Sequence, residues 1–190
     1  MIMRYTIFDH MMEGTEQEIA RLLPMVSQQR REQALRYQHL FGQYCCLKSY
    51  ELLMELLGDG SKPEFIYNEY GQPQLENGPY FSISHCKAGI AVAVSSNPIG
   101  IDIETIRNVQ PSLVAKTMNI DEQNKISQAI DSKLAFTQLW TKKEAYLKMR
   151  GTGIISNLKN TLLDVSNVHF QTFENLEKGY VVSLAHSSID

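Results

Sequence analysis

The chain has 190 residues and a mass of 21.7 kDa, enough for one substantial domain or for two small halves that share a core. Hydrophobic residues make up 43% and charged residues 21%, and the formal net charge of −3 disfavours a general nucleic-acid binder, which would be strongly basic. The first residues do not form a secretion signal and no apolar run approaches the roughly 18 residues of a membrane span, so we expect a cytoplasmic protein without a membrane segment.

The N-terminal part of the chain combines a strand, helices and then short strands. Residues 3–8, MRYTIF, predict a strand, and residues 15–57 predict helices that break at Pro24 and near Gly42. After the GDGSKP loop the apolar pattern becomes alternating, which predicts a series of short strands. These lie around residues 64–68, Leu75, 81–84, 89–94 and 99–104. The SSNP link before the last of them favours a hairpin between the final two strands.

The C-terminal part repeats the order of helices followed by strands. Helix patterns return at residues 112–118, 121–130 and 133–148. Asp131 and Ser132 are placed to cap the last of these helices, and Gly151 to end it. Strand patterns follow at residues 161–165 (TLLDV), 168–173 and 179–186. This order predicts an α+β protein in two halves, residues 1–97 and 98–190.

Basic residues gather in two segments of this acidic chain. Six stand against one acid between residues 133 and 159, and four against one acid between residues 30 and 48. Such local clusters indicate a compact anionic ligand, and solvated helix faces are the alternative.

The segment PIGIDIE, residues 98–104, carries two acids within an apolar strand pattern. Because alternate side chains of a strand share a face, Ile101 and Ile103 point to one side and Asp102 and Glu104 to the other. Two carboxylates about 6–7 Å apart along the strand can together bind a hard cation such as Mg²⁺ or Ca²⁺. The alternative is a half-exposed strand with a solvated acidic face.

A second candidate motif is LWTKKEAYLK, residues 139–148. At helical spacing Trp140, Glu144 and Lys148 lie on one face. One interpretation is an ordinary Glu-to-Lys pair, worth about 0.3–0.5 kcal/mol, beside a core tryptophan. The other is a helix that brings a third carboxylate and an ammonium to the Asp102 and Glu104 face, which would complete a site for a metal-bound phosphate.

The third motif is FSISHC, residues 81–86, in which serines alternate with apolar residues before His85. His85 is either functional or a surface residue at the end of a strand. The chain contains no Walker or dinucleotide glycine motif and no nucleophile-elbow pattern.

Together these motifs resemble the signature of the 4′-phosphopantetheinyl transferases, specifically the longer surfactin-type (Sfp-type) branch. PIGIDIE is similar to the family's G-[IV]-D-x-E block, and LWTKKEAYLKMRGTG to its W-[ST]-x-K-E-[SA]-x-x-K block. NEYGQPQL is similar to the E-x-G-K-P block, YFSISHC to the F-N-[IL]-S-H-S block, and SQQRREQALRY to the basic segment before the sheet. The five blocks stand in the family's order across about residues 27–153, which makes the resemblance specific.

The resemblance implies two similar halves related by pseudo-twofold symmetry, each a small, mostly antiparallel sheet packed with helices. It also implies a reaction in which a carrier-protein serine attacks the β-phosphate of coenzyme A, takes the phosphopantetheine group and releases adenosine 3′,5′-bisphosphate. By resemblance, Asp102, Glu104 and Glu144 hold Mg²⁺, and Lys148 contacts the phosphates. Asp102, Glu144 and Lys148 are then the catalytic set, while the choice of carboxylate as general base stays open.

The resemblance also assigns contacts with coenzyme A. They fall on Arg30, Arg36, Gly71, Gln72, Pro73, Ser84, His85 and Lys148. Gln72 replaces the lysine that the family usually has, and Gln33 replaces another basic residue, so the contacts to the 3′-phosphate are open.

The implied partner is an apo acyl or peptidyl carrier protein that docks on residues 105–120. Apolar residues suited to a carrier helix occur there, with Lys116 near them: Leu113, Val114, Met118 and Ile120. The short holo-acyl-carrier-protein synthases, typically trimers, carry the acid motif near the N-terminus, whereas about 100 residues precede Asp102, so we expect a monomer. The alternatives are a non-catalytic module that binds coenzyme A or a carrier, and a Mg²⁺-dependent nuclease. Nucleases generally take E-x-K on one strand, unlike Glu144 and Lys148.

Overall fold

The structure, a computed structural model, describes residues 3–11, 16–153 and 158–187. The N-terminal half contains β1 (Arg4–Phe8), α1 (Glu16–Leu22), η1 (Leu23–Met25), α2 (Gln28–Leu35), α3 (Leu40–Leu57), β2 (Phe65–Tyr67), β3 (Pro73–Leu75), β4 (Tyr80–Cys86) and β5 (Gly89–Ser95). Strands β1, β5 and β4 form an antiparallel sheet in that order, and β2 pairs with β3.

The C-terminal half has its own three-stranded sheet. It contains β6 (Ile99–Thr105), α4 (Pro111–Thr117), α5 (Ile120–Gln128), α6 (Ser132–Arg150), η2 (Leu158–Asn160), β7 (Val168–Asn175) and β8 (Tyr180–Ser187). The strand order is β6, β8, β7, with antiparallel pairing throughout. The predicted α+β class is therefore confirmed.

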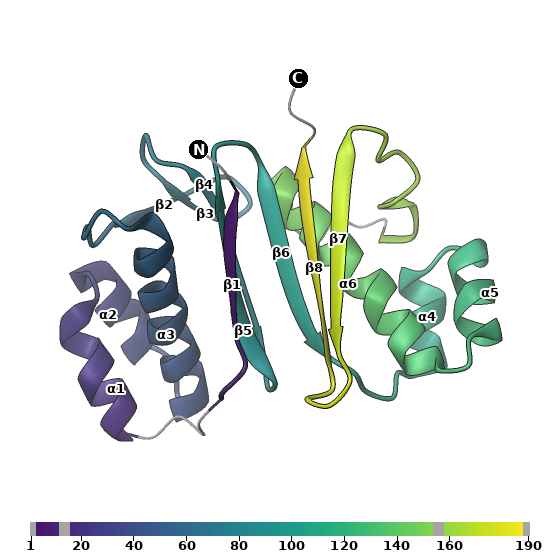
Figure 1. The fold of residues 1–190 in the computed structure, drawn as a ribbon, viewed down its shortest axis with the longest axis horizontal. Coiled ribbons are helices and arrows are strands. Elements are labelled where there is room, and N and C mark those ends of the chain that lie inside the picture. Colours follow the sequence, from purple (N-terminus) through teal and green to yellow (C-terminus); the bar gives the residue numbers. More distant parts are fainter. Residues whose placement is uncertain (1–2, 12–15, 154–157, 188–190) are drawn as a thin grey trace.

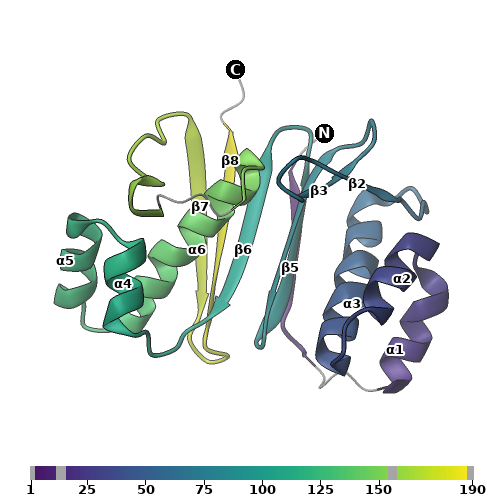
Figure 2. The ribbon, with the colours of Figure 1, turned by 180° about the vertical axis from the view of Figure 1, so that it is seen from behind.

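The two sheets lie between two long helices, α3 and α6 (Figures 1 and 2). One face of β5 packs against α3 through Val92 and Val94, because alternate residues of the strand point to opposite sides. The other face presents Ala91 and Ala93 to a core formed by residues of β6 and β8. Helix α6 packs on β6 and β8 from the far side. A pseudo-twofold relation between the halves stays a prediction.

Helix α6 is capped at both ends, and the caps fix the position of its side chains along β6. The Asp131 carboxylate accepts the backbone N–H groups of Lys133 and Leu134, both at 3.0 Å, and so satisfies two donors of the first turn. Gly151 ends the helix with φ of 70°, a conformation that glycine adopts without strain. Both predicted boundaries are confirmed. Among the described residues, none of the helices combines the length and apolarity needed to cross a bilayer.

The predicted break near Gly42 is wrong, because Gly42 lies inside α3 and the chain breaks at residues 36–39. A Cβ atom at position 42 would lie 2.8 Å from Cδ1 of Tyr37. The glycine therefore admits the Tyr37 ring against the first turn of the helix.

Two further strand predictions are also wrong. Strand β5 pairs with β1 and β4 while β6 pairs with β8, so the SSNP link joins two sheets and not the strands of a hairpin. Residues 161–164 form turns after η2, with Thr161 buried and Leu163 exposed. The apolar residues of this stretch lie beside a helix end and have no strand partner among the described residues.

Candidate functional site

The site forms where α6 crosses β6, and Gly100 permits this crossing. A Cβ atom at Gly100 would lie 1.8 Å from the backbone oxygen of Ala145 and 2.5 Å from the backbone nitrogen of Met149. The backbones of the strand and the helix therefore approach more closely than any side chain would allow. This approach brings the 144–148 turn of α6 next to Asp102.

Asp102 is the buried centre of the site. Its side chain, on the face of β6 opposite the buried Ile101 and Ile103, is only 5% exposed. Oδ1 of Asp102 accepts hydrogen bonds from Nζ of Lys148 at 2.7 Å and from the Ser84 hydroxyl at 2.7 Å. Nζ of Lys148 also donates to the backbone oxygen of Ile101 at 3.2 Å. Residues predicted from separate motifs thus meet at one carboxylate.

Glu104 and Glu144 lie within electrostatic reach of Asp102. Burial raises the pKa of Glu144 to about 6, and the negative charges of Asp102 and Glu104 add to this effect while Lys148 opposes it. Burial and the charge of Asp102 likewise raise the pKa of Glu104, against a hydrogen bond from Trp140. The three acids therefore repel one another in a desolvated space, a situation that a bound cation relieves.

The open carboxylate oxygens suit a hard cation. Oδ2 of Asp102 and Oε1 of Glu144 are both buried without a hydrogen-bond partner. Carboxylate oxygens are the ligands that Mg²⁺ prefers, so the donor chemistry fits the cation. Across residues 3–11, 16–153 and 158–187, however, no three His, Cys, Asp or Glu side chains are gathered as a metal-binding group.

Ser84 reaches the site from β4, whereas the next residue, His85, points to the opposite face of the strand, toward α3. Ser84 is 8% exposed and bonded to Asp102, whereas His85 is exposed by surface area and faces the ring of Phe41 edge-on at 6.5 Å between centroids. Desolvation by the surrounding protein lowers the pKa of His85, and the positive charges of Lys148 and Arg30 lower it further. His85 is thus electrostatically coupled to the Lys148 side of the site.

The two predicted arginines lie apart from this carboxylate cluster. Arg30 is buried, and its guanidinium donates to the backbone oxygen of Cys46 at 2.9 Å and to the Ser49 hydroxyl at 3.0 Å. It ties α2 to α3 in this arrangement. Arg36 lines a surface cavity of about 470 Å³ together with Gln33 and Tyr67.

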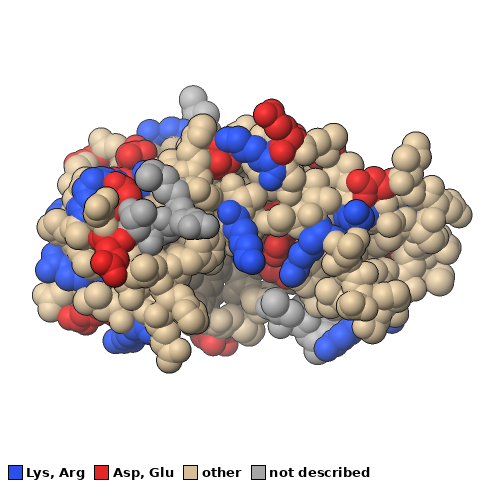
Figure 3. Space-filling view, turned by 90° about the horizontal axis from the view of Figure 1, so that it is seen from below, with Lys and Arg blue, Asp and Glu red and all other residues tan. Residues whose placement is uncertain are grey.

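The turn between β2 and β3 touches the end of α6. Nε2 of Gln72 donates to the backbone oxygen of Lys148 at 2.6 Å, and Nδ2 of Asn68 donates to the backbone oxygen of Gly151 at 2.8 Å. Gly71 makes the turn possible with φ of 79°. A cavity of about 410 Å³ lies beside this junction, and residues of both halves line it, among them Pro73 and Lys148. Figure 3 shows the face of the molecule that is seen from below. On this face, basic side chains lie on both sides of an acidic patch near the middle.

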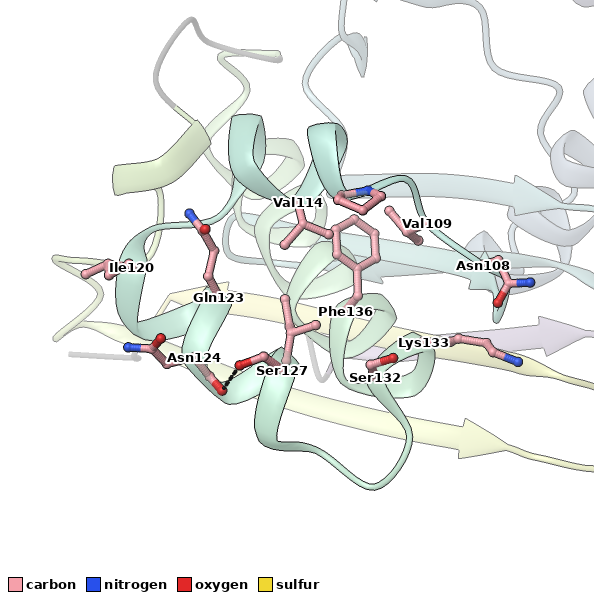
Figure 4. A pocket seen from close by; sticks show the side chains of 12 residues that line it. Asn108, Val109, Val114, Ile120, Gln123, Asn124, Ser127, Ser132, Lys133 and Phe136 are labelled. Carbon is pink, nitrogen blue, oxygen red and sulfur yellow. Dashed lines mark hydrogen bonds between the residues drawn. The ribbon is translucent and has the colours of Figure 1, made fainter.

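The predicted docking segment is only partly accessible. Leu113 and Ile120 are exposed by 37% and 68%, Val114 is partly buried, and Met118 is fully buried in a small core with Phe136. A cavity of about 490 Å³ opens between α4, α5 and the start of α6. Its floor is apolar, with Val109, Val114 and Phe136 close together and polar side chains at the rim (Figure 4).

Comparison with known proteins finds a family that resembles the C-terminal half. A sequence model of the 4′-phosphopantetheinyl transferase superfamily matches residues 98–189. Sequence similarity therefore links residues 98–189, just under half of the chain, to this superfamily. The match includes β6 and α6, the two elements that bring Asp102, Glu144 and Lys148 together.

Individual transferases extend the likeness into the N-terminal half. The chain is 30% identical to the 4′-phosphopantetheinyl transferase gsp of Aneurinibacillus migulanus, over 60% of this chain and 49% of that protein. It is 26% identical to the 4′-phosphopantetheinyl transferase Sfp of Bacillus subtilis (strain 168), over 74% of this chain and 66% of that protein. It is 33% identical to the transferase AcpT of Salmonella typhi, over 47% of this chain and 50% of that protein. The chain thus spans between half and two thirds of the length of these transferases.

Some residues that support the site from outside it were not predicted from sequence. Asn68 holds the end of α6 through its hydrogen bond to Gly151, and Trp140 lies beside Glu104 and lowers the pKa of that carboxyl group. Ser82 is buried and accepts the backbone N–H of Ile101 at 3.0 Å, which supports edge strand β6 from the neighbouring sheet. The alternation of Ser82 with Ser84 was the available signal, because both serines had to share a face.

Proposed function

We propose that this protein transfers 4′-phosphopantetheine from coenzyme A to a serine of an apo acyl or peptidyl carrier protein, with Mg²⁺, and releases adenosine 3′,5′-bisphosphate. The observation that carries the proposal is the contact of Lys148 with Asp102 at 2.7 Å, from elements 46 residues apart, beside two further acids. An acidic cluster with one fixed ammonium is the arrangement that phosphoryl transfer requires.

The carboxylates have separate roles in this proposal. Asp102, Glu104 and Glu144 would hold Mg²⁺, and the unpartnered oxygens of Asp102 and Glu144 support this assignment. Bound there, Mg²⁺ supplies positive charge for the diphosphate oxygens. Lys148 would add a second positive charge on the side of the phosphates.

Glu144 is the proposed proton acceptor. Without a cation, burial raises the pKa of its carboxylate to about 6, so it is ionised near neutral pH and can accept the serine proton directly or through a water molecule. The serine oxygen forms a bond to the β-phosphorus, and the bond from that phosphorus to the bridging oxygen breaks. The serine proton passes to Glu144, and adenosine 3′,5′-bisphosphate leaves with the bridging oxygen.

The nucleotide end of coenzyme A is proposed to occupy the cavity between the halves. Its volume of about 410 Å³ lies within the usual size of ligand pockets, roughly 300–1,000 Å³. Gln72 from one half and Lys148 from the other both border this cavity. One chain then supplies the whole site, which supports a monomer.

The test is transfer itself. The full chain is incubated with coenzyme A, Mg²⁺ and a panel of apo carrier proteins, and intact mass reports the phosphopantetheine gain. We expect at least one carrier to gain the group, Asp102→Ala to abolish the gain, and Lys148→Ala to slow it by about 10²–10³, as for the loss of a fixed charge at such a site. Lys142→Ala, on the same helix, is the control.

The result also separates the alternatives. Binding of coenzyme A with no gain in any carrier would support a non-catalytic module. Transfer by Asp102→Ala at the wild-type rate would remove the proposed metal site.

A further inference from the structure

We propose that Ser84 is a positioning residue whose hydroxyl orients the carboxylate of Asp102 for the cation and does not itself donate to a coenzyme A phosphate. The inference rests on the proposed function, because it concerns the same site. Ser84 lies in β4 opposite Ala91 of β5, so its side chain points toward the second sheet and β6. Burial to 8% exposure keeps it away from bulk solvent.

The hydrogen-bond capacity of a serine decides between the two roles. A hydroxyl has a single hydrogen to donate, whereas phosphate and carboxylate oxygens only accept. Ser84 donates that hydrogen to Oδ1 of Asp102 at 2.7 Å. The hydroxyl therefore has no hydrogen left for a phosphate oxygen while this bond exists.

The bond makes the two oxygens of Asp102 different. Oδ1 receives both Ser84 and Lys148, while Oδ2 is buried and has no partner. The ammonium of Lys148 lies at the end of a long side chain that is 26% exposed. The short, buried side chain of Ser84 is therefore the more rigid of the two donors. Outer hydrogen bonds of this kind hold a ligating carboxylate in one orientation. The free Oδ2 is consequently presented for coordination.

Ser82 offers a matched control on the same strand and face. It is 4% exposed, and its hydroxyl accepts the backbone N–H of Ile101 at 3.0 Å. Removing this hydroxyl disturbs the joint between β4 and β6 without removing a donor to a carboxylate. If structural damage alone weakened cation binding, both serine variants would show it. If the orientation of Asp102 matters, only Ser84→Ala would bind the cation more weakly.

The experiment measures Mn²⁺ binding to the full chain without coenzyme A, by the electron paramagnetic resonance of free Mn²⁺. We expect Ser84→Ala to bind Mn²⁺ about 10–100-fold more weakly than wild type, the usual effect of losing an outer partner of a metal ligand. Ser84→Thr, which keeps the hydroxyl, restores most of the affinity. Ser82→Ala keeps wild-type affinity but melts at a lower temperature. Calorimetry on the metal-free protein shows unchanged coenzyme A affinity for Ser84→Ala.

Two results would overturn the inference while leaving the proposed function in place. One is wild-type Mn²⁺ affinity in Ser84→Ala. The other is a loss of coenzyme A affinity in that variant with Mn²⁺ binding unchanged, which would make Ser84 a phosphate contact. A wild-type chain that binds no Mn²⁺ and labels no carrier would instead reject the proposed function and this inference together.

Discussion

Gly100 sets the distance between α6 and β6, and thereby the geometry of the site. The atoms that a Cβ would meet belong to the backbone of α6, which cannot move aside as a flexible side chain can. We expect Gly100→Ala to lower the free energy of unfolding by at least about 1–3 kcal/mol, the usual range for overpacking, and to reduce transfer as well. Urea unfolding monitored by circular dichroism measures the first effect.

Gly42→Ala is the control for this prediction. The atom nearest to the added Cβ there is the ring carbon Cδ1 of Tyr37, at 2.8 Å, and this exposed side chain can turn aside. A Gly100→Ala variant as stable as Gly42→Ala would show that α6 does not depend on this close approach.

At the residue scale, alternation along β6 predicted which acids share a face, and helical spacing placed Glu144 and Lys148 together. Neither pattern predicts the direct ion pair of Lys148 with Asp102. A pair of residues 46 positions apart depends on how the strand and the helix cross. The contact of Arg30 with coenzyme A, which the resemblance implies, stays a prediction. In this structure its guanidinium donates to carbonyl and hydroxyl acceptors of α3.

At the scale of elements, a buried lysine joins α6 to segments that precede and follow it. Nζ of Lys143 is fully buried and donates to Oε2 of Glu122 at 2.7 Å and to the backbone oxygens of Thr117 and Leu158, each at 2.8 Å. Lys143→Met would leave Glu122 and two carbonyls without their donor. We expect a loss of about 3–5 kcal/mol in the free energy of unfolding, the usual result of breaking a buried ion pair.

A double-mutant cycle checks this assignment. Glu122→Gln keeps an oxygen for the N–H of Asn119, the other partner of this side chain in the cap of α5. The double variant Lys143→Met/Glu122→Gln should lose less stability than the sum of the single changes, because no charge is left unpaired. Additive losses would mean that the pair is not coupled.

Glu51 joins α1 to α3 and gives this pair of helices a pH dependence. Burial raises the pKa of Glu51, but hydrogen bonds from Arg21 and Lys48 outweigh it, so the pKa lies below its ordinary value of 4.5. A lowered folded-state pKa contributes stability above the unfolded pKa, and this stability is lost as the pH falls through the folded pKa. We expect Glu51→Gln to lose roughly 1.5–3 kcal/mol at neutral pH, the range for hydrogen bonds to a charged group.

The test compares wild type with Glu51→Gln in urea at pH 7 and again below pH 4.5, the ordinary value for this carboxyl group. The difference in stability should shrink in acid. Glu55→Gln, an exposed position on the same helix, should change little at either pH. A difference for Glu51→Gln that stays constant with pH would contradict the ion-pair explanation.

Elements with local end signals could be predicted from the sequence, whereas long-range strand pairing could not. Helix α6 has both end signals in its own sequence, a capping Asp131 and a left-handed Gly151, so its bounds follow locally. Pairing between β6 and β8 joins residues about 80 apart in the chain, as in Ile101 with Leu184, and no local pattern specifies it. Residues 161–165 have a strand-like composition but lack a strand to pair with in the described part of the chain.

At the scale of the whole molecule, contacts at three places add to the bonds of Ser82 and Ser84 with β6 in joining the halves. Ala91 and Ala93 of one sheet are fully buried in a core with residues of the other sheet. Gln72 and Asn68 hold the end of α6, as described above. At a third place Asp9, after β1, accepts hydrogen bonds from Lys178 at 2.9 Å and Tyr180 at 2.8 Å, beside the turn between β7 and β8.

This shared core predicts that the two halves unfold together. Separating residues 1–97 from 98–190 would expose the apolar faces of both sheets, since the fully buried Ile101, Val182 and Leu184 pack in the same cluster as the alanines of β5. We expect calorimetry of the full chain to give one transition whose calorimetric and van't Hoff enthalpies agree. A fragment of residues 1–97 should aggregate or lack cooperative unfolding, because its sheet would present this apolar face to water. Two separate transitions, or a fragment that folds by itself, would show that the halves are independent domains and that the site lies at a movable junction.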